Sequence, residues 1–88
     1  MNKKLEFNEV LEIVFDVSSQ ILRIPVIELN SNAHIINDLN ADSIAMLKLR
    51  SVLEQKFDIL IPKEIEISTL GNITKYIYTR KEEASLLF

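Results

Sequence analysis

Apolar residues recur at three- and four-residue steps in three stretches of this chain, and each stretch predicts an amphipathic helix. The first runs from residue 7 to 22, and Pro25 limits its continuation because a proline ring clashes with a preceding helical turn. The second begins at Asp42 or Ser43, with Asp42 as a natural N-cap, and runs to about residue 57. The third follows Ser68, another N-cap candidate, and ends near Arg80.

One side of each predicted helix should face a shared core. The expected core-facing residues are Phe7, Val10, Leu11, Val14, Ile21 and Leu22 in the first, Ile44, Leu47, Val52, Leu53 and Phe57 in the second, and Leu70, Ile73, Tyr76 and Ile77 in the third.

The connection over residues 24–41 is long for a compact domain and contains many turn-forming asparagines. It also has apolar anchors that should pack it down: Val26, Ile27, Leu29, Ile35, Ile36 and Leu39. Residues 24–29 and 58–61 are rich in β-branched residues, but neither has a hairpin partner at short range. We therefore predict an all-α, small three-to-four-helix bundle with a long loop between the first two main helices. Residues 63–67 could add one short helical turn.

The length of 88 residues predicts one domain, with a core over residues 7–80 and a tail over 81–88. The absence of cysteine and the single histidine, His34, exclude thiolate chemistry and any site with two imidazoles, so no catalytic or metal site is expected. His34 itself is expected to be a solvated loop residue. No apolar run approaches the roughly 18 residues of a membrane span, and the net charge of −3 disfavours nucleic-acid binding. We expect a cytoplasmic protein without a membrane span.

The candidate chemistry lies in the segment Asp38-Leu39-Asn40-Ala41-Asp42-Ser43-Ile44. It places a serine hydroxyl in the first turn of a helix, directly after an acidic residue. A helix N-terminus presents unpaired N–H groups and partial positive charge, which favour an attached anion. A phosphodiester on Ser43 would therefore be stabilised. Asp42 and Asp38 either serve only as N-cap and turn residues or also help a modifying enzyme to hold Mg²⁺.

This segment resembles the attachment motif of acyl carrier proteins, which reads Asp-Ser-Leu at the start of the second helix. Further matches follow in order at Leu29, Asn32-Ala33, Leu53-Glu54, Phe57-Asp58, Ile61-Pro62, Ser68-Thr69-Leu70 and Tyr76-Ile77, so that the resemblance covers residues 7–80. It implies that Ser43 receives a 4′-phosphopantetheine arm from coenzyme A and has no catalytic role. It also implies as partners a phosphopantetheinyl transferase and the acyl-transferring or ligase and condensing enzymes of one pathway, with the chain a monomer.

The chain departs from that family in four respects. Asn40 and Ile44 replace the usual Gly and Leu, and the stretch before Ser68 is about two residues shorter, which puts the usual third helix in doubt. The second helix has three basic residues and one acidic residue, a net charge of +2, where fatty-acid carriers are acidic. We therefore expect Ile44, Lys48 and Arg50 to dock a dedicated partner, although a merely solvated face stays open for the basic residues. Met46 could be plain core or could line a cargo pocket.

Two other functions stay open from the sequence. The chain could carry aminoacyl or aryl groups in place of fatty-acyl or polyketide intermediates. It could also be an adaptor with the carrier fold and no arm, although the intact Asp42-Ser43 pair argues against this. An enzyme in its own right is not expected.

Overall fold

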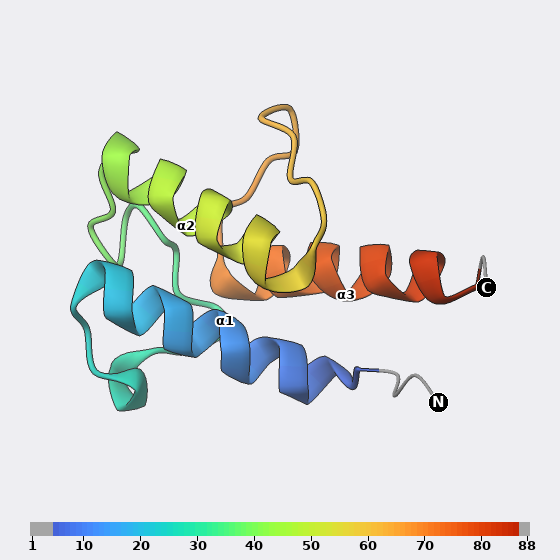
Figure 1. The fold of residues 1–88 in the computed structure, drawn as a ribbon. Helices are drawn as coiled ribbons and strands as arrows, with labels where there is room; N and C mark the ends of the chain where they lie inside the picture. Colours follow the sequence, from blue (N-terminus) through green and yellow to red (C-terminus); the bar gives the residue numbers. More distant parts are fainter. Residues whose placement is uncertain (1–4, 87–88) are drawn as a thin grey trace.

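Three α-helices build the protein, as the hydrophobic periodicity predicts. The computed structural model describes residues 5–86, in which α1 spans Phe7–Leu22, a 3₁₀ turn η1 spans Val26–Glu28, α2 spans Ser43–Phe57 and α3 spans Leu70–Leu86. Figure 1 shows α1 and α3 running side by side, with α2 crossing them above. The buried residues of all three helices and of the connecting loops form one core, in which Leu53 and Ile73 are fully buried. The all-α expectation is confirmed.

The ends of α1 and α2 follow from local chemistry. Arg23 and Asp58 take left-handed conformations with φ of 58° and 53°, and each N–H bonds back into the last helical turn. Lys81 of α3 reinforces the end of α2, because its ammonium donates to the Phe57 carbonyl at 3.0 Å.

The N-cap predicted for α3 is wrong by one residue. Thr69 is the cap: its Oγ1 accepts from the Asn72 N–H at 3.1 Å, and the Asn72 side chain accepts from the Thr69 N–H at 3.2 Å. The Ser68 hydroxyl instead donates to the Asn72 side chain. The helix also continues to Leu86 and does not end near Arg80. Added side-chain links in this extra stretch, such as Tyr78 to Glu82 at 2.8 Å, favour the continuation.

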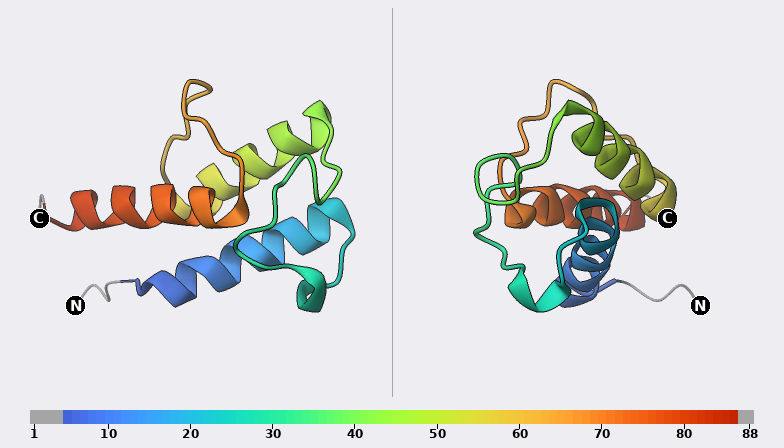
Figure 2. Two further views of the ribbon diagram at one scale, coloured as in Figure 1. Left: turned by 180° about the vertical axis from the view of Figure 1, so that it is seen from behind. Right: turned by 90° about the vertical axis from the view of Figure 1, so that its left-hand side faces the viewer.

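The long connection between α1 and α2 is packed down, but by fewer anchors than expected. Leu29 and Ile35 are buried, whereas Val26, Ile27 and Ile36 are exposed. Ile27 is exposed because the single turn of η1 directs it away from the core. Backbone hydrogen bonds from Ile35 to the Ser68 carbonyl (2.8 Å) and from Gly71 to the Ser31 carbonyl (2.8 Å) tie this loop to the start of α3. Figure 2 shows the loop wrapping one end of the bundle.

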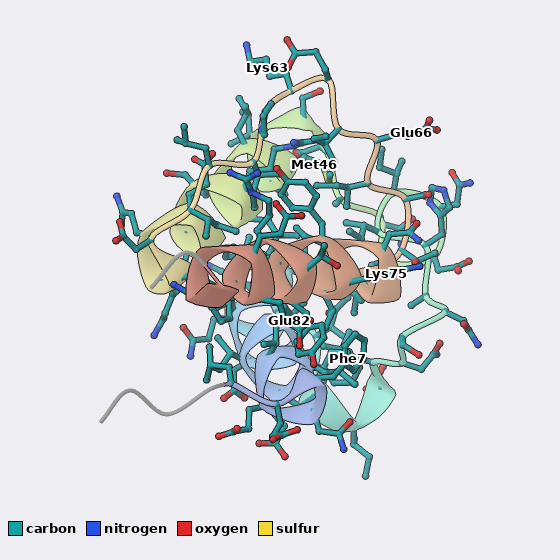
Figure 3. All side chains as sticks on the ribbon, turned by 90° about the vertical axis from the view of Figure 1, so that its right-hand side faces the viewer. Phe7, Met46, Lys63, Glu66, Lys75 and Glu82 are labelled. Atoms are coloured by element: carbon teal, nitrogen blue, oxygen red, sulfur yellow. The ribbon has the colours of Figure 1, made fainter. Side chains whose placement is uncertain are left out.

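Residues 59–69 contain no helix, so the short helical turn suggested for residues 63–67 is wrong. They form an arched loop with one hydrogen-bonded turn, in which the Ile65 N–H donates to the Pro62 carbonyl at 3.1 Å. In Figure 3, Lys63 lies at the tip of this arch and Met46 lies beneath it. Two residues of α2 hold the arch: the Arg50 guanidinium donates to the Pro62 and Ile65 carbonyls at 3.0 and 3.1 Å, and Glu54 accepts from the Ile61 N–H at 2.7 Å.

Replacing Arg50 with alanine should therefore loosen this loop. The change removes charge-assisted hydrogen bonds and leaves the partly buried Ile65 carbonyl without the donor that Arg50 supplies, so the free energy of unfolding should fall by about 1–3 kcal/mol. Amide hydrogen exchange over residues 61–65 should accelerate. Denaturant unfolding and exchange measured by mass spectrometry check both effects. Lys48→Ala, which removes an exposed cation from the same helix, is the matched control and should change stability by less than about 0.5 kcal/mol. Equal losses in the two variants would contradict the role given to Arg50.

Candidate functional site

The expected site lies at the N-terminus of α2 and includes the hydrogen-bonded turn that precedes this helix. The turn before it is closed twice: the Asp38 carboxylate accepts from the His34 N–H at 2.8 Å, and the His34 ring nitrogen Nδ1 accepts from the Asn37 N–H at 3.2 Å. His34 is thus a loop residue, as expected, but it is half-buried and therefore only partly solvated. Asn40 follows in the left-handed region, with φ of 59°, which asparagine tolerates better than most residues. This explains how Asn40 can replace glycine.

Asp42 caps α2 as predicted. Its carboxylate accepts from the Ala45 N–H at 2.8 Å, and its carbonyl accepts the first helical hydrogen bond, from Met46 at 2.9 Å. The N–H groups of Ser43 and Ile44 precede the first regular helical bonds, and within residues 5–86 no carbonyl or side chain accepts from either. They are available to solvent or to an anion.

Ser43 is the first residue of α2, and its side chain is exposed. A phosphodiester on its Oγ would lie beside the unpaired N–H groups and the positive end of the helix dipole, so the residues present fit such a group. No imidazole contacts the hydroxyl, because the single histidine accepts from Asn37. Ser43 thus presents an exposed hydroxyl at the first position of α2, and no imidazole among the described residues contacts it.

The structure brings Ser43, Asp42 and Ile44 together on adjoining positions of one helix start. Asp38 lies in the preceding turn, and its carboxylate orders that turn. Among the described side chains, no three histidine, aspartate or glutamate residues gather as ligands for a metal ion. A groove between residues 65–68 and α3 lies elsewhere and does not include Ser43; its lining residues are Ile65, Glu66, Ser68, Asn72, Lys75, Tyr76 and Thr79.

Two residues expected in the core of α2 lie outside it. Ile44 is 66% exposed and Leu47 is 56% exposed, whereas Leu49, which the prediction omitted, is buried. The reason is the helical period: Leu49, Leu53 and Phe57 repeat every four residues on one side, and Leu47 falls on the opposite side with Ser51 and Gln55. Those polar neighbours are the signal that could have placed Leu47 on the surface.

Lys48 and Arg50 do not share a face. Lys48 is exposed on the outer side of α2, while Arg50 turns toward the 59–69 loop and binds its carbonyls. Sequence reasoning missed this internal use of Arg50, because the carbonyls that it binds are 12 and 15 residues further along the chain.

Comparisons with known proteins agree with this geometry. The family described as the phosphopantetheine attachment site matches residues 10–77. The chain is 37% identical over 75 residues to an acyl carrier protein of Prochlorococcus marinus (strain MIT 9515), covering 83% of this chain and 94% of that one. It is 36% identical over 76 residues to an acyl carrier protein of Clostridium acetobutylicum, covering 84% of this chain and 99% of the relative. The solved structure of the acyl carrier protein from Enterococcus faecalis is similar, with a TM-score of 0.72 at 31% identity over 85% of this chain and 98% of that one.

Proposed function

The chain belongs to the acyl carrier protein family, and from that premise we propose that Ser43 bears its 4′-phosphopantetheine arm and that the protein carries acyl intermediates on it as thioesters. The observation that supports this most is the exposed Ser43 hydroxyl at the first position of α2, directly behind the Asp42 cap and inside the matched residues 10–77. The pathway is fatty-acid, polyketide or related biosynthesis in the cytoplasm, with the chain acting as a monomer.

In this modification the chain presents one reacting atom, the Ser43 Oγ, to the transferase. The Asp42 cap and the closed turn around His34 hold Ser43 in place before any enzyme binds. Its Oγ would form the ester bond to the phosphate that stays with the arm while the diphosphate bond of coenzyme A breaks, so that the nucleotide half leaves with the bridging oxygen and the hydroxyl proton passes to a base on the phosphopantetheinyl transferase. The N–H groups of Ser43 and Ile44 would be available to stabilise the attached phosphate. The thiol of the bound arm supplies the thioester chemistry.

Asp42 and Asp38 support this modification. Each carboxylate accepts a backbone N–H within the chain, and both are exposed, so their outward lone pairs stay available to a cation held by the transferase. The exchange of acyl groups needs pathway enzymes as partners, because the chain has no cysteine and its one histidine is engaged in a turn. We therefore infer a carrier and not an enzyme. Within residues 5–86, no helix has the length and apolar character to cross a bilayer.

The proposal is tested by loading the purified apo-protein with coenzyme A and a promiscuous phosphopantetheinyl transferase. Intact mass spectrometry should show the addition of one arm, and proteolysis should place it on the peptide that contains Ser43. Loading from acyl coenzyme A should add the acyl group as well, and neutral hydroxylamine should release that group while the arm stays attached. No mass gain would favour an arm-free adaptor, and an arm on another residue would contradict the assignment of Ser43.

A further inference from the structure

The outer face of α2, which we define as Ile44, Leu47, Lys48, Ser51 and Gln55, is turned away from the core and is exposed along its whole length. Two large apolar side chains, Ile44 and Leu47, follow Ser43 in the first turns of α2, and both are more than half exposed. More than half of each side chain in this pair is left outside the core of the domain. The pair is available to a partner that would bury it.

The charges of α2 are divided between the inside and the outside of the molecule. Arg50 and Glu54 both bind the backbone of the 59–69 loop, so they belong to the fold. Lys48 is exposed, and in the described part of the chain no carboxylate pairs with it. The outer face therefore presents one positive charge and no negative charge, on a chain whose net charge is −3.

We propose that the outer face of α2 docks a pathway enzyme whose own surface has an apolar pocket edged by carboxylates. This rests on the proposed function, because an enzyme that reaches an arm on Ser43 must approach the same end of α2. Ile44 and Leu47 would enter the pocket, and Lys48 would lie against its acidic edge. Complementary charge steers such an encounter, and the outer face itself, unlike the preceding turn with Asp38 and Asp42, offers no carboxylate to an enzyme with a basic docking patch.

The proposal can be tested with one enzyme in two forms. The first is a fatty-acid ketoacyl synthase with a basic docking patch, and the second is the same enzyme with the basic residues of that patch changed to glutamate. Both are first assayed on an acyl-pantetheine, which bypasses docking, and the rates are normalised to that value. The loaded wild-type chain should then show a kcat/KM about tenfold higher with the acidic form at low salt, and this difference should shrink at high salt.

Lys48→Glu should reverse this preference. Lys75→Glu makes the same change of charge at an exposed position of α3, outside the outer face of α2, and should leave the preference as in wild type. For the apolar part, Leu47→Ala should lower kcat/KM with the acidic form several-fold. Ile27→Ala is its matched control: Ile27 is 93% exposed on η1, and Figures 1 and 2 show η1 on the far side of α1 from α2. Circular dichroism confirms that each variant is folded.

Intact mass is measured for every variant before the assay, so two failures can be told apart. A chain that takes up no arm contradicts the proposed function. A fully loaded wild type that shows no preference between the two enzyme forms, or a Lys48→Glu variant that behaves like Lys75→Glu, overturns the docking proposal alone.

Discussion

Ser43→Ala should abolish loading completely: after incubation with coenzyme A and a promiscuous transferase, the variant should keep the mass of the apo-protein. Alanine has no oxygen to form the phosphoester, and no other described serine combines exposure, the first position of an α-helix and an acidic cap before it. Ser18 is fully buried, and the Ser68 hydroxyl donates to the Asn72 side chain.

The fold of this variant should be unchanged. The cap of α2 is the bond from the Ala45 N–H to the Asp42 carboxylate, in which the Ser43 side chain takes no part. The free energy of unfolding should therefore stay within about 0.5 kcal/mol of wild type, as for most surface substitutions. Ser51→Ala, on the exposed side of the same helix, is the matched control and should load as the wild type does. An arm detected on folded Ser43→Ala would contradict the assignment.

Phe57→Ala should leave the domain largely unfolded or molten. Phe57 is 4% exposed at the last position of α2 and belongs to the single core that joins all three helices. Truncation of a buried phenylalanine typically costs about 3–5 kcal/mol. Domains are stable by only about 5–15 kcal/mol, and small ones lie toward the low end of that range. Circular dichroism and thermal unfolding should show reduced helicity at room temperature, or a broad transition at much lower temperature than in wild type.

Leu60→Ala is the matched control for this prediction. Leu60 lies three residues beyond Phe57 but is 73% exposed, so its loss removes little buried area. The control should unfold cooperatively and close to the wild-type temperature. If Phe57→Ala did the same, the side chain would contribute much less to the core than its burial indicates.

Much of the fold was predictable because the signals are local. The apolar period, the stop before Pro25 and the Asp42 cap act within one or two helical turns, and the predicted bounds of α1 and α2 agree with the structure. The position of Ser43 at the first turn of α2 follows from the same cap. The chemistry inferred for that position needs only an exposed hydroxyl at a helix start, which neighbouring residues can specify.

Tertiary structure decided which apolar residues are buried and which charges stay outside. α2 has apolar residues on both sides: the polar residues on the side of Leu47 indicate its exposure, but Leu49 is buried only in the core that all three helices share. Arg50 and Lys48 are similar cations two residues apart, yet the arched loop offers carbonyls to Arg50 alone. Burial and long-range hydrogen bonds depend on groups that are distant in the sequence and meet only after folding. For that reason the attachment serine could be identified from its neighbours, whereas the surface around it required the assembled bundle.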